Sequence, residues 1–211
     1  MVPEFTTEAL RVLRDPSYFS WNAITLLGLA IYVYGVEIEK RNWSTVCAGL
    51  AFWSMDWINE VINGIVLHCT GTAALWTTTG RSSLQILIGL NLEICLLFSF
   101  AGLAFAKTLP KNAALRIFGI PNRILAVLGF SIFSVIIELY LHATGSFHWY
   151  YSFWDEKTPW LIIPFGYGTF YAAAAWAHDL PTLRAKLKFT GTLVGTAAAL
   201  LIIFGPMLGW L

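Results

Sequence analysis

Six long apolar segments alternate with shorter polar stretches along this chain of 211 residues. A helix needs about 20 mostly apolar residues to cross the hydrocarbon core of a bilayer. The pattern therefore predicts an all-α, polytopic bundle of about six transmembrane helices, at residues 20–38, 44–68, 84–106, 121–142, 159–177 and 190–210. Because no linker or shift in composition divides the chain, residues 1–211 are expected to form a single transmembrane domain.

The N-terminal residues 1–19 are more polar and contain acidic side chains. They lack the basic region and short apolar core of a cleaved signal peptide, so the first span is expected to be the targeting signal. Residues 3–16 favour a short amphipathic helix at the membrane interface, ended by Pro16.

Four acidic side chains interrupt the apolar segments: Asp56, Glu60, Glu93 and Glu138. A charged side chain at the centre of a bilayer costs roughly 2.5–3.5 kcal/mol on insertion scales. Such residues generally face the interior of a bundle and serve function there. We expect these acids to form the functional site.

Three of the segments carry polar residues at helical spacing, so that each set shares one face of its helix. The sets are Asp56, Asn59, Glu60 and Asn63 in 44–68, Gln85, Gly89 and Glu93 in 84–106, and Ser131, Ser134, Glu138 and His142 in 121–142. At about 1.5 Å rise per residue, the three glutamates fall within roughly one helical turn of each other in depth. The spacing therefore predicts one pocket in the outer half of the bundle.

Composition supports a membrane location, since 57% of the residues are hydrophobic and 12% are charged, against about 25% charged in soluble domains. A net charge of +1 provides no basic field for nucleic acid. Nine basic residues lie in the first, third and fifth loops: Lys40, Arg41, Lys107, Lys111, Arg116, Arg123, Arg184, Lys186 and Lys188. The other side has four: Arg11, Arg14, Arg81 and Lys157. The positive-inside rule then predicts cytoplasmic loops 1, 3 and 5 and both termini outside.

Two outer loops stand out. Residues 69–83 are small and hydroxyl-rich around Trp76, and residues 143–158 are dense in aromatic rings. The rings are expected either to form an aromatic belt at the membrane interface or to form a lid over a cavity.

Several carboxyl groups in one low-dielectric cavity cannot all stay ionised. One of them would then act as a buried general acid and another as a base. The alternative is a network of hydrogen bonds that only holds the helices together. No Walker loop, nucleophile elbow or dinucleotide-binding motif is present, and no pattern indicates a cofactor.

Three short segments resemble small integral-membrane enzymes. Residues 53–60 (WSMDWINE) look like the acidic second-helix segment of meroterpenoid terpene cyclases, and residues 138–150 with 159–164 resemble the Glu, Gly, Trp/Tyr and Pro pattern of carotenoid hydratases. The chain is also similar in its intramembrane acids to sterol isomerases of the emopamil-binding type, although Glu138 and His142 occur in the reverse order. These resemblances imply proton chemistry on a carbon skeleton.

The leading hypothesis is a membrane-embedded cyclase, isomerase or hydratase that acts on a terpenoid or other lipophilic substrate among membrane lipids. Glu60 and Glu93 would be the proton-handling pair, and Glu138 with His142 would act as a relay or second acid. Asp56 with Asn63 would orient the catalytic groups. Rings and amides expected to bind substrate are Trp53, Trp57, Asn63, Trp76, Trp149, Tyr150 and Trp154. Alternatives are a proton- or cation-coupled transporter, an accessory subunit of a membrane complex, and a metal-dependent membrane oxidase.

Overall fold

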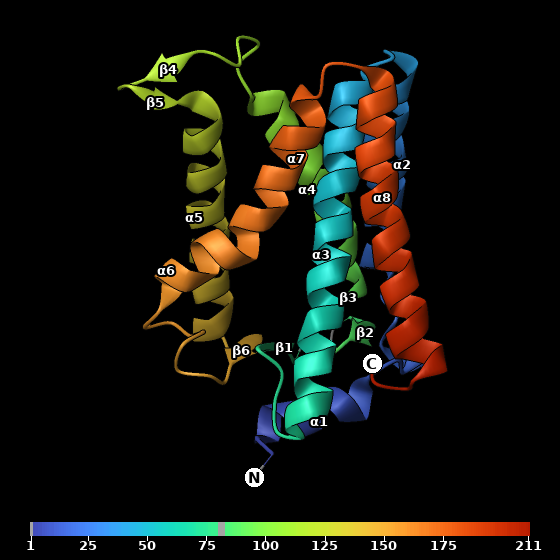
Figure 1. Cartoon of the computed structure of the whole chain (residues 1–211). Helices are drawn as coiled ribbons and strands as arrows, with labels where there is room; N and C mark the ends of the chain where they lie inside the picture. The colour runs from blue at the N-terminus through green and yellow to red at the C-terminus, as the bar shows by residue number, and fades with distance from the viewer. Residues whose placement is uncertain (1, 80–82) are drawn as a thin grey trace.

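The computed structural model describes residues 2–79 and 83–211, and it is mostly helical, as predicted. Figure 1 shows the long helices running side by side, with both chain ends at the same end of the bundle. The helices are α1 (Glu4–Val12), η1 (Pro16–Tyr18), α2 (Trp21–Glu39), α3 (Trp43–Thr70), α4 (Leu92–Thr108), α5 (Asn122–Ala143), α6 (Pro159–Ile162), η2 (Ile163–Tyr167), α7 (Gly168–Asp179), α8 (Leu183–Ile202) and η3 (Ile203–Met207).

Short antiparallel strand pairs lie at the two ends of the bundle. They are β1 (Trp76–Thr78) with β6 (Phe147–Trp149), β2 (Gln85–Leu87) with β3 (Leu90–Asn91), and β4 (Arg116–Ile117) with β5 (Ile120–Pro121). The β1–β6 pair joins the two outer loops that the sequence singled out, with Trp76 opposite Trp149. Segments about 70 residues apart in the sequence therefore form one cap.

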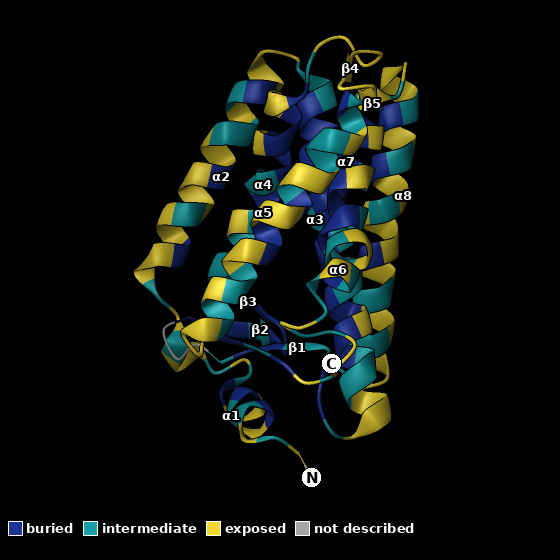
Figure 2. Cartoon of the chain, turned by 90° about the vertical axis from the view of Figure 1, so that its left-hand side faces the viewer, coloured by how far each residue is buried: buried dark blue, intermediate teal, exposed yellow. Residues whose placement is uncertain are grey.

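Helix α3 is the centre of the bundle, packed against α4, α7 and α8. Figure 2 shows buried residues along α3 and exposed residues along the outward faces of α2, α5 and α8. Small residues allow the close approach: Ala48 and Ala51 on α3 are fully buried, and a side chain at Gly102 of α4 would meet Phe52. This is the packing that membrane helices favour, because small residues let backbones approach.

The predicted span at 84–106 is wrong over its first eight residues. Asn91 caps α4 by accepting a hydrogen bond from the Ile94 amide at 2.9 Å, so the helix begins at Leu92. The preceding residues turn at Gly89 into the β2–β3 pair instead. Gln85, Gly89 and Glu93 consequently do not share a helix face.

Three helices are long and apolar enough to cross a membrane by length and composition: Trp21–Glu39, Asn122–Ala143 and Leu183–Met207. The predicted count of six is thus not confirmed. Helix α4 is short because of its late start, and α7 is separated from α6 by the π-helical turn η2 around Pro164. Helix α3 is long but carries the buried polar stripe.

The N-terminal segment forms the expected short helix, α1, which lies across the end of the bundle (Figure 1). Its Ala9 packs with Ala74 and Ile88. The Arg14 amide donates to the Gln85 carbonyl at 2.8 Å, which ties this segment to the β2–β3 pair.

At the opposite end, an ion pair joins α5 to α7. The Arg123 guanidinium donates to both carboxylate oxygens of Asp179, at 2.6 and 2.9 Å. Burial raises the pKa of Asp179, but the hydrogen bonds from Arg123 and His178 outweigh it and hold that pKa below its usual value. The carboxylate therefore stays ionised in this pair at neutral pH.

A side-chain amide holds the outer cap on α3. Asn63 donates through Nδ2 to the Trp76 carbonyl at 2.7 Å and accepts through Oδ1 from the Trp76 amide at 3.1 Å. Both backbone groups of Trp76 are satisfied by this one side chain, which is fully buried.

Replacing Asn63 with Ala should destabilise the protein by about 1–3 kcal/mol, because the Trp76 amide and carbonyl lose the partner that the fully buried Asn63 provides. Asn59→Ala is the matched control, since Asn59 donates only to the Met55 carbonyl of its own helix. Thermal unfolding in detergent should show a clearly larger loss for Asn63→Ala. Equal losses for the two variants would show that the Asn63 contact does not stabilise the cap.

Candidate functional site

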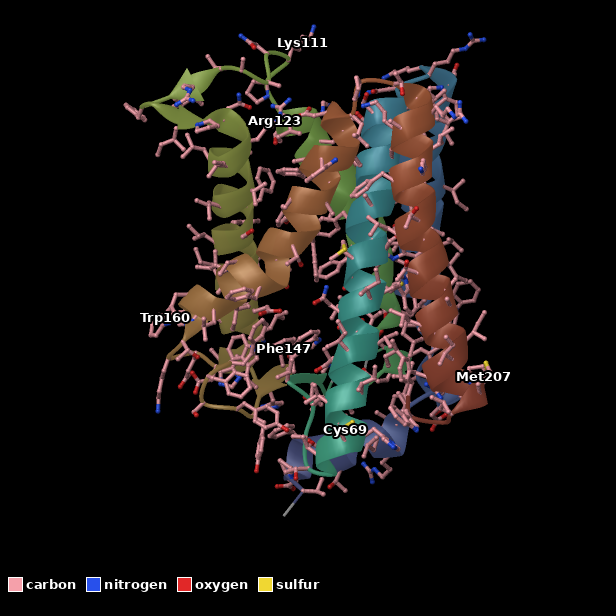
Figure 3. All side chains as sticks on the ribbon, viewed as in Figure 1. Cys69, Lys111, Arg123, Phe147, Trp160 and Met207 are labelled. Atoms are coloured by element: carbon pink, nitrogen blue, oxygen red, sulfur yellow. The ribbon has the colours of Figure 1, made fainter. Side chains whose placement is uncertain are left out.

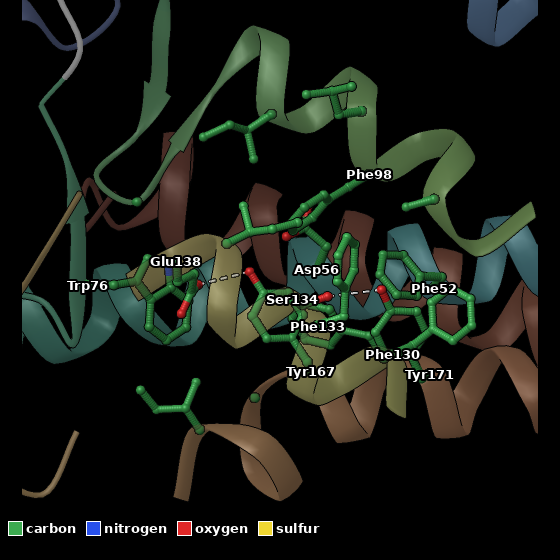
Figure 4. Close-up of a pocket in the computed structure, with 18 of the residues that line it drawn as sticks. Phe52, Asp56, Trp76, Phe98, Phe130, Phe133, Ser134, Glu138, Tyr167 and Tyr171 are labelled. Atoms are coloured by element: carbon green, nitrogen blue, oxygen red, sulfur yellow. Dashed lines mark hydrogen bonds between the residues drawn. The ribbon is translucent and has the colours of Figure 1, made fainter. Parts of the chain in front are cut away.

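The interior contains an apolar cavity of about 410 Å³ between α3, α4, α5 and the α6–α7 segment. Figure 4 shows side chains from these elements converging on it. Its lining is rich in rings: Phe52, Trp76, Phe98, Phe100, Phe130, Phe133, Phe147, Trp154, Tyr167, Phe170 and Tyr171. The predicted pocket in the bundle therefore exists, with walls that are mainly aromatic.

Three carboxyl groups face this cavity: Asp56 and Glu60 one turn apart on α3, and Glu138 on α5. Asp56 is 2% exposed and Glu60 4%. One oxygen of each group is buried without a hydrogen-bond partner among the described residues: Asp56 Oδ2, Glu60 Oε2 and Glu138 Oε2. Buried polar atoms nearly always have partners, so three orphaned oxygens on one cavity indicate a site for a ligand or a reacting group.

The three acids differ in their remaining contacts. Trp76 donates from Nε1 to Glu60 Oε1 at 2.7 Å, and Tyr167 donates from its hydroxyl to Glu138 Oε1 at 2.9 Å. No hydrogen bond to Asp56 joins it to another described side chain. Donors stabilise the ionised form of a carboxyl group, whereas an apolar surrounding favours the neutral form.

Trp76 is fixed from several sides at the outer end of the cavity. Asn63 holds its backbone, and its ring stacks against Trp154 with centroids 6.2 Å apart. A side chain at Gly89 would collide with the Trp76 indole and the Asn63 amide. The turn before α4 therefore needs glycine for Trp76 to reach Glu60.

The cavity opens sideways between α4 and α5. Leu97 of α4 and Phe133 and Ile137 of α5 all line it, yet they are 43%, 59% and 44% exposed. Residues that line a cavity and also lie on the surface mark its mouth. The mouth is apolar and lies on the flank of the bundle, away from its polar ends.

Two tyrosines of the α6–α7 segment complete the site and were missed by the sequence argument. Tyr167 bonds Glu138, and the Tyr171 hydroxyl lies 3.0 Å from Ser134 Oγ (Figure 4). Their four-residue spacing places both on one helix face. That spacing was the signal available in the sequence.

The structure separates Glu93 from the other acids. It lies in the first turn of α4, where its Oε1 accepts a hydrogen bond from Ser20 Oγ at 2.7 Å, and it does not line the cavity. His142 also lies outside the lining: its Nδ1 is 2.9 Å from the Phe147 carbonyl and its Nε2 is 3.5 Å from Glu156. Their expected pairing with Glu60 and Glu138 is therefore not formed.

Among the rings predicted to bind substrate, Trp76 and Trp154 line the cavity. Trp53 and Trp57 point to another face of α3, where they pack with Leu90 and Cys95. Trp149 is buried against Phe147 and His142, and Tyr150 is exposed. Asn63 acts on Trp76 without lining the cavity. The sequence pattern grouped all these residues near the site, but it did not resolve which of their side chains face the cavity.

Within residues 2–79 and 83–211, no three side chains of the metal-ligating types His, Cys, Asp and Glu form a group that could hold a metal ion. The expected outer-side Arg81 lies outside the described residues.

Comparison with known proteins identifies the family of this chain, and the matching proteins carry no described activity. No solved structure matches the chain. An uncharacterized protein of Archaeoglobus fulgidus is 40% identical over 211 residues, covering all of both chains. A second uncharacterized protein of the same organism is 40% identical over 53 residues, which is 25% of this chain and 95% of the relative. The profile of a family described as an uncharacterized membrane protein family matches residues 3–206, and the chain belongs to that family.

Proposed function

We propose that the protein is a membrane-embedded acid–base enzyme that acts on a neutral, lipophilic alkene such as a terpenoid. One observation carries the proposal: Asp56, Glu60 and Glu138 line one aromatic cavity whose mouth is on the flank of the bundle, and each has one buried oxygen without a hydrogen-bond partner among the described residues. A substrate dissolved in the bilayer would enter between α4 and α5 without passing through water.

In this proposal the chain crosses the membrane six times, through α2, α3, α4, α5, the α6–α7 segment and α8. Basic side chains gather at one end of the bundle, where Figure 3 labels Lys111 and Arg123, while Cys69 and Met207 lie at the other. The positive-inside rule makes the basic end cytoplasmic. The cavity acids then lie toward the outer half, and α1 lies at the outer interface.

Asp56 is the proposed proton donor. It has no hydrogen-bond donor among the described residues and shares its cavity wall with apolar groups such as Phe52 and Phe98, so ionising it would leave an unpaired buried charge. It would transfer its proton to one carbon of a C=C bond, whose π electrons form the new C–H bond. The adjacent carbon becomes a carbocation.

The rings around Asp56 would stabilise that cation. Phe98 and Phe170 also line the cavity and pack edge to face, with ring centroids 6.5 Å apart. The ring of Tyr171 lies tilted against that of Phe52, with centroids 4.8 Å apart. Ring faces attract cations by about 2 kcal/mol or more where water is excluded. The aromatic wall thus lowers the barrier at the step where charge develops.

Glu138 is the proposed base, since its carboxylate is supported by the Tyr167 hydroxyl and its Oε2 is free. It would remove a proton from a neighbouring carbon, which re-forms a C=C bond at a new position. One proton enters and one leaves, so the net change is an isomerisation. Attack by a second C=C bond before that loss would give cyclisation, and attack by water would give hydration. Glu138 would then release that proton to solvent, and Glu60, held by Trp76, would pass a solvent-derived proton to Asp56.

The proposed reaction places a solvent-derived proton on carbon. Purified protein incubated in D₂O with neutral isoprenoid alkenes (geranylgeraniol and squalene) should yield lipid with carbon-bound deuterium, detected by mass spectrometry. Mass spectrometry of lipid that co-purifies with the protein extends the panel. Absence of carbon-bound deuterium in the panel and in the co-purified lipid would contradict the proposal.

Removing a catalytic carboxyl should abolish turnover without unfolding the protein. Asp56→Asn and Glu138→Gln should each lower the deuterium incorporation rate by roughly 100-fold or more, the usual contribution of a general acid or base. Glu93→Gln is the matched control, because it removes an intramembrane carboxyl that contacts Ser20 and not the cavity. A comparable loss in Glu93→Gln would contradict the assignment.

The topology can be tested with cysteine labelling. Cys69 is exposed at the proposed outer end, whereas Cys47 and Cys95 are buried. In right-side-out vesicles, a membrane-impermeant maleimide should label native Cys69. In a Cys69→Ser, Lys111→Cys variant, labelling should require permeabilisation. The opposite result would invert the proposed orientation.

A further inference from the structure

The charges that face the cavity have one sign. Asp56, Glu60 and Glu138 line it, and no Lys, Arg or His does so among the described residues. Two basic side chains of the helices that surround the cavity pair elsewhere: Lys107 with Glu37 at 2.6 Å and Arg123 with Asp179. An anionic ligand in this cavity would meet like charge in a low dielectric, which disfavours its binding.

Two carboxyl groups at the cavity also have an oxygen that accepts no hydrogen bond from the described residues. Glu60 and Glu138 each use one oxygen to accept from Trp76 or Tyr167 and leave the other buried and free. A ligand that donates a hydrogen bond and carries positive charge would satisfy such an oxygen and pair with it. Aromatic faces on the same walls favour the same ligand, as in sites that recognise ammonium groups.

We propose that this cavity selects lipophilic ammonium cations, meaning amines with an apolar isoprenoid-sized tail, over neutral and anionic lipids of the same skeleton. The ammonium group would lie between Glu60 and Glu138, with its tail along Phe98, Phe130 and Phe133 toward the mouth. The inference rests on the proposed function for the use of the site, since a bound ammonium occupies the place of the carbocation. The evidence for the cation site is separate, because cation binding needs only the negative charge of the carboxylates and the aromatic rings of the cavity wall.

Three ligands with one skeleton test the selection: N,N-dimethylgeranylamine, geraniol and geranic acid. Binding to the purified full chain in a neutral detergent, measured by equilibrium dialysis at neutral pH, should be saturable and at least 10-fold tighter for the amine than for the alcohol. Geranic acid should bind more weakly than geraniol. Equal binding of amine and alcohol, or tighter binding of the acid, would overturn the inference.

Variants locate the cation in the cavity. Glu60→Gln and Glu138→Gln should each weaken amine binding several-fold while geraniol binding persists, which also shows that the protein is folded. Glu93→Gln should bind the amine as the parent chain does. If Glu93→Gln loses as much affinity as the cavity variants, the cation does not bind where we propose.

The deuterium experiment separates this inference from the proposed enzyme. Amine selection without deuterium incorporation supports the cation site and contradicts the acid–base chemistry, leaving cation transport as the use of the cavity. Deuterium incorporation without amine selection supports the enzyme and overturns the cation site.

Discussion

The structure depends on the cost of placing carboxyl and amide groups in an apolar environment. Helix α3 carries Asp56, Glu60 and Asn63 on one face, and such a stripe cannot face lipid. The helix therefore takes the centre, where α4, α7 and α8 cover it. Helices α2, α5 and α8 have the apolar outward faces, and they are the ones that resemble ordinary transmembrane spans.

The same constraint accounts for the shape of the cavity. The π-helical turn at Ile163–Tyr167 precedes α7, which leans between α5 and α3 in Figure 1. Its tyrosines reach Glu138 and Ser134 on α5, while its alanines pack closely on the neighbouring helices. Apolar residues of α4 and α5 form the mouth of the cavity. Tyr167 and Tyr171, at the start of the slanted α7, thus supply the hydrogen bonds to Glu138 and Ser134 at one wall of the cavity.

The outer cap links folding to the site. Asn63 anchors the Trp76 backbone on α3, Gly89 leaves room for the indole, and the indole N–H then reaches Glu60. Three segments that are separate in the sequence thus set the position of one hydrogen-bond donor. The β1–β6 pair brings the aromatic outer loop to the same end, where Trp154 stacks on Trp76. The loop therefore contributes to the cavity wall, as the lid interpretation of the sequence expected.

The sequence by itself determined the helical class and most of the helical segments, and it singled out Asp56, Glu60 and Glu138, which line one cavity in the structure. These follow from hydropathy and helical spacing, which are local properties. Tertiary structure decided the rest. Glu93 had the right residue type and depth, but the Asn91 cap and the Gly89 turn start α4 late and leave Glu93 bonded to Ser20. Trp53 and Asp56 are neighbours in sequence, yet only Asp56 faces the cavity. Which helix faces meet depends on how the helices pack against one another. That packing consists of contacts between residues far apart in the sequence, and no local pattern encodes them.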